Sequence, residues 1–116
     1  EWDHVAPWRS VYKFHLLTDT DSTFLLTNGG QNAGIVSEPG LPLRHYRMST
    51  KQNDDPYSDP EPWAAQNDTR DGSWWPEFAG WLKARSGDLA SPPPMGAVER
   101  GLKPICDAPG TYVLQQ

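Results

Sequence analysis

The stretch FLLTNGGQNAGIVSEPG, residues 24–40, determines how the rest of the chain is interpreted. Residues 22–27 are β-branched and apolar without alternation, which is typical of a strand covered on both faces. The glycine pair that follows allows a sharp turn, because glycine has backbone freedom that other residues lack. The first side chain after this turn is Gln31. The pattern therefore predicts a buried strand that leads into a loop, with an amide where a catalytic layout would place a histidine.

Helical patterns flank this strand. Apolar residues at helical spacing predict a helix over residues 7–17, with a proline in its first turn. A short helix is expected over residues 60–66, with Asp59 as its N-cap. Residues 44–50 predict a short edge strand between these two helices. We therefore expect helices to cover a small number of strands.

The clearest helix in the sequence covers residues 76–85. Phe78, Trp81 and Leu82 fall on one face of it at helical spacing. An apolar face of this width usually packs against another layer. We therefore expect Trp81 to be largely buried.

The order of the elements indicates the fold class. Helix, buried strand, glycine turn, helices and an extended tail follow one another, as at the end of a parallel α/β sheet. With 116 residues the chain is at most one domain. Residues 1–90 are expected to form its strand and helix part, and residues 91–116 a proline-rich extended tail. Asp3 and Gln31 would both lie at the carboxyl ends of strands in such a sheet if a strand ends just before residue 1.

Composition excludes several classes of protein. The net charge of −5, without a basic stripe, argues against a nucleic acid partner. The sequence has no apolar run long enough for a membrane span, and its single cysteine excludes an internal disulfide framework. The mean hydropathy of −0.71 is low for a compact domain, whereas six tryptophans can bury large apolar areas. We therefore expect the chain to pack against something that it does not contain.

The titratable residues offer few catalytic candidates. Asp3, next to His4, is either a loop residue that caps the following helix or a catalytic carboxylate. His15 and His45 have no second ligand at metal spacing, so no metal site is expected. Cys106 lies in the proline-rich tail, without the strand-to-helix turn that exposes a nucleophile. We expect Cys106 to be a packing or incidental thiol.

Four ordered motifs carry a resemblance to a known family. The motifs are DHVAPW (residues 3–8), GGQNAGIVSEPG (29–40), GSWWPEFAGWLKARSG (72–87) and APGTYV (108–113). The most specific of them is GSWWPEFAGWL. In this order they resemble the C-terminal segment of polyhydroxyalkanoate (PHA) synthases of the class I type, and the resemblance runs over the whole chain.

The resemblance implies a fold, a reaction and a site. It implies the C-terminal part of an α/β-hydrolase-like catalytic domain, in an acyltransferase that polymerises hydroxyacyl-CoA into polyester and releases CoA. The family uses a cysteine, an aspartate and a histidine; Asp3 matches the aspartate and Gln31 the histidine, while the cysteine would lie upstream of this chain. No cofactor is implied. The implied partners are the remainder of the domain, the polyester granule surface and a second copy in a homodimer, and the implied location is cytoplasmic or granule-associated.

Gln31 decides what the chain can do alone. Glutamine donates and accepts hydrogen bonds, but it has no proton equilibrium near neutral pH. General acid–base help typically contributes about 10²- to 10⁴-fold to a rate. We therefore expect the chain by itself to be inactive. The alternative is a non-catalytic homologue or fragment that acts as a partner subunit or a granule-binding module.

Overall fold

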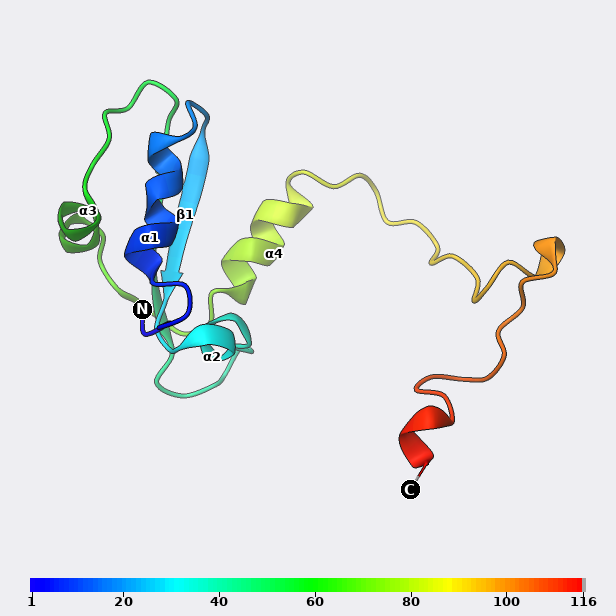
Figure 1. Ribbon diagram of the computed structural model, residues 1–116. Helices are drawn as coiled ribbons and strands as arrows, with labels where there is room; N and C mark the ends of the chain where they lie inside the picture. The colour runs from blue at the N-terminus through cyan, green and yellow to red at the C-terminus, as the bar shows by residue number, and fades with distance from the viewer. Residues whose placement is uncertain (116) are drawn as a thin grey trace. The chain divides into compact units, whose positions relative to one another are not determined.

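The computed structural model describes residues 1–115, in two units: Glu1–Ser86 and a second unit that begins at Gly87. The first unit holds all the strands and α-helices (Figure 1). The second holds two short 3₁₀ turns, Val98–Arg100 and Tyr112–Leu114. The elements of the first unit are α1 (Trp8–Tyr12), the 3₁₀ turn η1 (Lys13–Leu16), β1 (Ser22–Thr27), α2 (Gln31–Ile35), β2 (His45–Lys51), α3 (Pro60–Gln66), β3 (Arg70–Asp71) and α4 (Trp75–Lys83).

The three strands form one antiparallel sheet in the order β1-β2-β3. The pairing of β1 with β2 runs from Ser22 opposite Lys51 to Thr27 opposite Tyr46. The predicted strand at residues 22–27 is confirmed, but two expectations are wrong. The strand pairs are antiparallel rather than parallel, and β2 is central rather than an edge strand. The connection from β1 holds only the one-turn α2, and its prolines prevent a longer crossover helix, so the chain returns beside β1 in the opposite direction.

The core lies on one face of the sheet, under α1 and α3. Tyr12, Phe24, Leu26 and Trp63 are buried there. The Tyr12 ring meets those of Phe24 and Trp63 at centroid distances of 5.0 and 5.5 Å, and α1 runs along β1 (Figure 1). Burial on both faces of β1 was predicted, but Thr23 on the other face is exposed. The coarse class is α/β, with a strand that is buried on one face only.

Helix formation follows the sequence patterns: α3 has its predicted bounds, and α4 begins one residue earlier and ends two residues earlier than predicted. The region predicted as one helix over residues 7–17 divides into α1 and η1. Asp59 stands at the N-cap of α3, yet its side chain makes no capping hydrogen bond. Among the described residues, no helix is long and apolar enough to cross a membrane.

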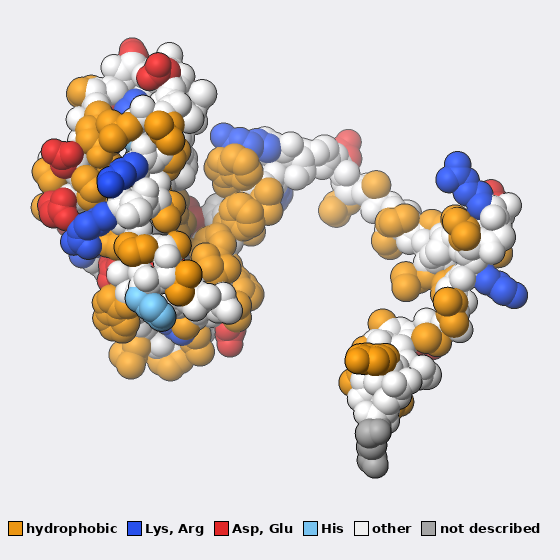
Figure 2. Space-filling model, in the orientation of Figure 1, with side chains coloured by type: hydrophobic (Ala, Val, Ile, Leu, Met, Phe, Trp, Pro, Cys, Tyr) orange, Lys and Arg blue, Asp and Glu red, His pale blue; other side chains and the backbone are white. Residues whose placement is uncertain are grey.

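The aromatic face of α4 remains open. Trp81 is 45% exposed, so the prediction that it is largely buried is wrong. Its ring stacks on Phe78 at a centroid distance of 6.3 Å, and the Arg85 guanidinium lies 4.2 Å from it on the next turn. Both neighbours belong to the same helical region. Hydrophobic side chains along α4 are exposed to solvent (Figure 2). The periodicity predicted the apolar face correctly, but the described residues supply no layer that covers it.

Candidate functional site

The first residues of the chain lie against the glycine turn. The Glu1 ammonium donates a hydrogen bond to the Thr27 carbonyl at 2.6 Å, and the Trp2 N–H donates to the Gly29 carbonyl at 3.0 Å. The donor moves from residue 1 to residue 2 while the acceptor moves from residue 27 to residue 29. The N-terminal segment therefore runs in the same direction as β1, beside the edge of β1 that does not pair with β2. This contact brings the loop that carries Asp3 to the end of β1.

Asp3 organises the loop that leads into α1. Its Oδ1 accepts hydrogen bonds from the Val5 N–H at 2.8 Å and the Ala6 N–H at 2.9 Å. The bond from Ala6 is the largest cause that lowers the pKa of the Asp3 carboxyl, with a further contribution from Val5. The Asp3 side chain therefore fixes its own loop and stays ionised. Among the described residues, its Oδ2 accepts no hydrogen bond.

Gln31 begins α2 directly after the glycine turn. Its φ of +23° is in a region that residues other than glycine rarely adopt. Such conformations cost about 1–3 kcal/mol and gather at functional sites. A Cβ on Gly30 would lie 3.3 Å from the Trp2 carbonyl oxygen, so the turn and the N-terminal segment approach backbone to backbone. The Gln31 side chain is exposed beside this contact.

A groove of about 1080 Å³ contains both candidate residues. Its walls come from the free edge and outer face of β1, from α2 and from the aromatic side of α4, and Asp3 and Gln31 line it together. Such a volume is close to the upper end of the range for typical small-molecule sites, about 300 to 1,000 Å³. The resemblance implies that these two residues belong to one site. That their side chains reach one small group stays a prediction.

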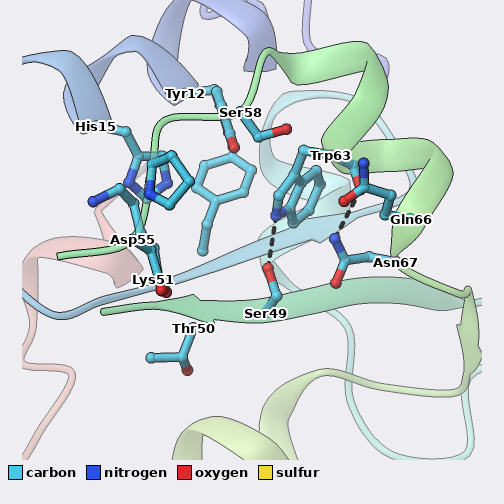
Figure 3. A pocket seen from close by; sticks show the side chains of 12 residues that line it. Tyr12, His15, Ser49, Thr50, Lys51, Asp55, Ser58, Trp63, Gln66 and Asn67 are labelled. Atoms are coloured by element: carbon cyan, nitrogen blue, oxygen red, sulfur yellow. Dashed lines mark hydrogen bonds between the residues drawn. The ribbon is translucent and has the colours of Figure 1, made fainter. Parts of the chain in front are cut away.

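A second hollow lies on the opposite face of the sheet, among the core aromatics. Figure 3 shows this pocket of about 290 Å³, with Tyr12, His15 and Trp63 on its walls. The Trp63 Nε1–H donates to the Ser49 hydroxyl at 2.7 Å. His15 Nδ1 lies 3.2 Å from the Ser22 hydroxyl, and burial, helped by the charge of Lys51, lowers the pKa of His15. The pocket contains neither Asp3 nor Gln31.

The remaining sequence candidates are not gathered around the groove. His4 is exposed, and it makes no hydrogen bond to Asp3 in the part of the chain that the structure describes. Cys106 is exposed in the second unit. Within residues 1–115, no three His, Cys, Asp or Glu side chains come together as a metal site would require.

Sequence reasoning missed one charged residue beside the glycine turn. Arg44 reaches under the turn, where its Nη1 lies 2.9 Å from the place that a Cβ on Gly29 would take. Its Nε is buried and has no hydrogen-bond partner among the described residues. Gly29 itself has φ +103°, a backbone conformation that favours glycine. A lone arginine between a loop and a strand carries no local pattern that would have indicated this contact.

Comparison with known proteins finds similarity over nearly the whole chain. No family model matches the sequence. The chain is 39% identical over 115 residues to poly(3-hydroxyalkanoate) polymerase 2 of Ectopseudomonas oleovorans, covering 97% of this chain and 19% of that protein. It is 34% identical over 113 residues to the poly(3-hydroxyalkanoate) polymerase subunit PhaC of Cupriavidus necator, covering 96% of the chain and 18% of that protein. For the corresponding subunit of Rhizobium etli the identity is 31% over 115 residues, with 98% and 17% covered. The chain thus spans less than a fifth of the length of these curated relatives.

Proposed function

We propose that this chain, which is similar to poly(3-hydroxyalkanoate) polymerases over nearly its whole length, is the C-terminal segment of such an enzyme and supplies the aspartate and histidine positions of its active site. The term "parent polymerase" means the longer protein to which this segment would belong. The reaction proposed for it is the polymerisation of hydroxyacyl-CoA into polyester with release of CoA. The observation that carries the proposal is the placement of Asp3 and Gln31 in one groove at the end of β1.

The unpaired edge of β1 supports an α/β-hydrolase-like fold for the parent. The hydrogen bonds from Glu1 to Thr27 and from Trp2 to Gly29 start a parallel alignment along that edge. In a polymerase of the relatives' length, we expect the polypeptide before Glu1 to extend this alignment as a parallel strand. Asp3 would then follow the end of that strand, as catalytic residues do in open α/β sheets. The remainder of the domain is accordingly the first partner that we propose for this chain.

The proposed chemistry needs a proton carrier at residue 31. A cysteine thiolate from the parent would attack the thioester carbonyl, forming a new acyl–sulfur bond while the bond to the CoA sulfur breaks. The thiol proton has to leave the cysteine and reach the departing CoA thiolate, and a histidine can carry it. Asp3, which its loop keeps ionised, would fix the tautomer of such a histidine or help to activate the hydroxyl of the next monomer. Gln31 can hold a substrate oxygen by hydrogen bonding, but it cannot carry this proton.

The decisive experiment measures CoA release from a hydroxyacyl-CoA. It compares the parent polymerase with Gln31 intact and with the Gln31→His substitution. We expect a gain of about 10²-fold or more, the usual scale for a positioned base. Asn32→His is the matched control, because it adds the same imidazole one exposed position further along and should give no gain. Equal rates with Gln31 intact and with Gln31→His would mean that another group supplies the base or that the site is not catalytic.

A binding role is the second candidate, and two observations favour it. Gln31 stands at the histidine position, and α4 exposes the apolar side chains of Phe78, Trp81 and Leu82. A segment that kept its scaffold without its base would act as a partner subunit or as a module on the polyester granule surface, in the cytoplasm. Co-sedimentation with polyester granules tests this role. Retention that Trp81→Ala abolishes, with no CoA release by any form, would favour the binding module over the acyltransferase.

A further inference from the structure

The helix that carries residue 31 is too short to hold its own position. α2 has five residues, and its backbone hydrogen bonds include Gly34 N–H to the Gly30 carbonyl at 3.2 Å and Val36 N–H to the Asn32 carbonyl at 2.9 Å. The last carbonyls of any helix lack partners within it, and a single turn is unfavourable by itself in water. The place of α2 must therefore be set by contacts from outside.

Three consecutive residues of the most specific motif supply such contacts. The Trp74 indole N–H lies within hydrogen-bonding distance of the Gly34 and Ile35 carbonyls, at 3.1 and 3.2 Å, and the Trp75 indole N–H donates to the Ile35 carbonyl at 2.9 Å. The Ser73 hydroxyl donates to the Ser37 carbonyl, and both serines are buried. Donors from residues 73–75 thus occupy the carbonyls at the end of α2 and just beyond it.

The other side of α2 is fixed by the end of β1. A Cβ on Gly34 would lie only 2.5 Å from the Thr27 hydroxyl oxygen and 3.2 Å from the Asn28 carbonyl oxygen. The glycine lets α2 sit directly on the strand end, where a larger residue would force the Thr27 side chain or the backbone to shift. α2 is therefore held between the end of β1 and the donors of residues 73–75.

Trp74 and Trp75 act here mainly as hydrogen-bond donors, because neither side chain is fully buried. Trp75 is 37% exposed and Trp74 is only partly buried. An indole N–H can only donate, so each needs an acceptor in a fixed place. Trp81 on the same helix makes no such bond from its indole among the described residues. All three tryptophans are partly exposed, so burial does not separate them. The hydrogen bonds from the indole N–H groups set Trp74 and Trp75 apart from Trp81.

We propose that Ser73, Trp74 and Trp75 form a clamp that fixes α2 and thereby positions residue 31 in the active-site loop. The role in catalysis rests on the function proposed above, whereas the clamp itself is a property of the fold. Trp74 and Trp75 are positioning residues that act through α2, some 40 positions earlier in the sequence. A misplacement of about 1 Å at a reacting group can cost about 10²-fold in rate, so a clamp on α2 bears directly on turnover.

The test uses Trp74→Phe, Trp75→Phe and the double variant in the parent polymerase with Gln31→His. Phenylalanine keeps an aromatic ring and removes the donor, and Trp81→Phe is the matched control. Backbone hydrogen exchange is followed by mass spectrometry in peptides that cover residues 31–37 and residues 22–27. We expect exchange at residues 31–37 to accelerate about tenfold in the double variant, the scale of one or two lost hydrogen bonds, while residues 22–27 stay unchanged. Trp81→Phe should change neither.

The same variants separate positioning from structural support. We expect kcat for CoA release to fall about tenfold or more in the double variant while KM changes less than about twofold. Unchanged exchange at residues 31–37 would overturn the clamp. Faster exchange with an unchanged kcat would overturn its positioning role and leave the proposed function standing. If the parent polymerase shows no turnover with any of the variants, only the proposed function is overturned. Hydrogen exchange at residues 31–37 still decides whether the clamp exists. If the double variant loses protection at residues 22–27 as well, the single variants are compared in its place.

Discussion

At the scale of single residues, His15 makes the stability of the core depend on pH. Its ring lies in η1 against the rings of Tyr12 and Phe14, at centroid distances of 4.7 and 4.0 Å. Burial lowers its pKa below the ordinary value of 6.5, so the folded state holds the neutral ring. Because the unfolded chain binds this proton more readily, the stabilisation is complete above pH 6.5. It is lost as the pH falls from 6.5 toward the lowered pKa of the folded state.

We therefore expect the free energy of unfolding to decrease when the pH is lowered from about 7 to about 5. The His15→Gln variant should be less stable at about pH 7, and it should lose this contribution to the slope. Urea unfolding of both forms across that pH range measures the difference. An equal slope in the variant would mean that other groups cause the dependence.

The residues of the candidate site were predictable to different degrees. Asp3 and Gln31 could be identified because each lies within a quoted motif. Arg44 lies in none of these motifs, and its place beside Gly29 leaves no pattern in the sequence. Trp74 lies in a quoted motif, but nothing in that motif indicates its acceptor, the Gly34 carbonyl, 40 positions earlier in the chain. Trp81 was assigned correctly to an apolar face and wrongly to the interior, because periodicity gives the face of a helix but not the layer that covers it.

At the scale of elements, two glycines test how α2 is seated. Gly34→Ala would place a methyl group 2.5 Å from the Thr27 hydroxyl oxygen, so we expect a loss of about 1–3 kcal/mol of stability. Gly80→Ala is the control, because the added Cβ meets no atom within 4 Å inside α4. Alanine in a helix interior should stabilise by about 0.5–1 kcal/mol. Urea unfolding of the two variants should therefore move the midpoint in opposite directions. A Gly34→Ala variant as stable as the natural sequence would mean that α2 can shift freely off the strand.

The elements themselves were predicted where local pattern decides them. β1 matches its predicted bounds, because a short apolar run ends at a glycine turn. α2 was missed, since one helical turn has no apolar period and depends on the donors of residues 73–75. The direction of β2 was also beyond local pattern, because strand pairing depends on how the whole connection folds back.

At the scale of the whole molecule, the first unit has one face that is covered by packed helices and one open face, which the described residues do not cover. Tyr12, Phe24 and Trp63 close the side under α1 and α3. The other side presents the groove, the unpaired edge of β1 and the aromatic residues of α4. Unpaired edges and large apolar surfaces favour association with other chains or with a missing part of the same fold. The open face therefore agrees with a segment that spans less than a fifth of its relatives.

This asymmetry predicts how the 116-residue chain behaves by itself. With three strands and a single small core it should be weakly stable, and its open face should cause self-association. Sedimentation velocity over a range of concentrations measures the association, and a thermal scan measures the stability. Trp81→Ser should reduce association without a loss of stability, because its 45% exposed ring packs only within its own helical region. A clean monomer that unfolds sharply at high temperature would instead identify a self-sufficient module, whose open face needs no further chain to cover it.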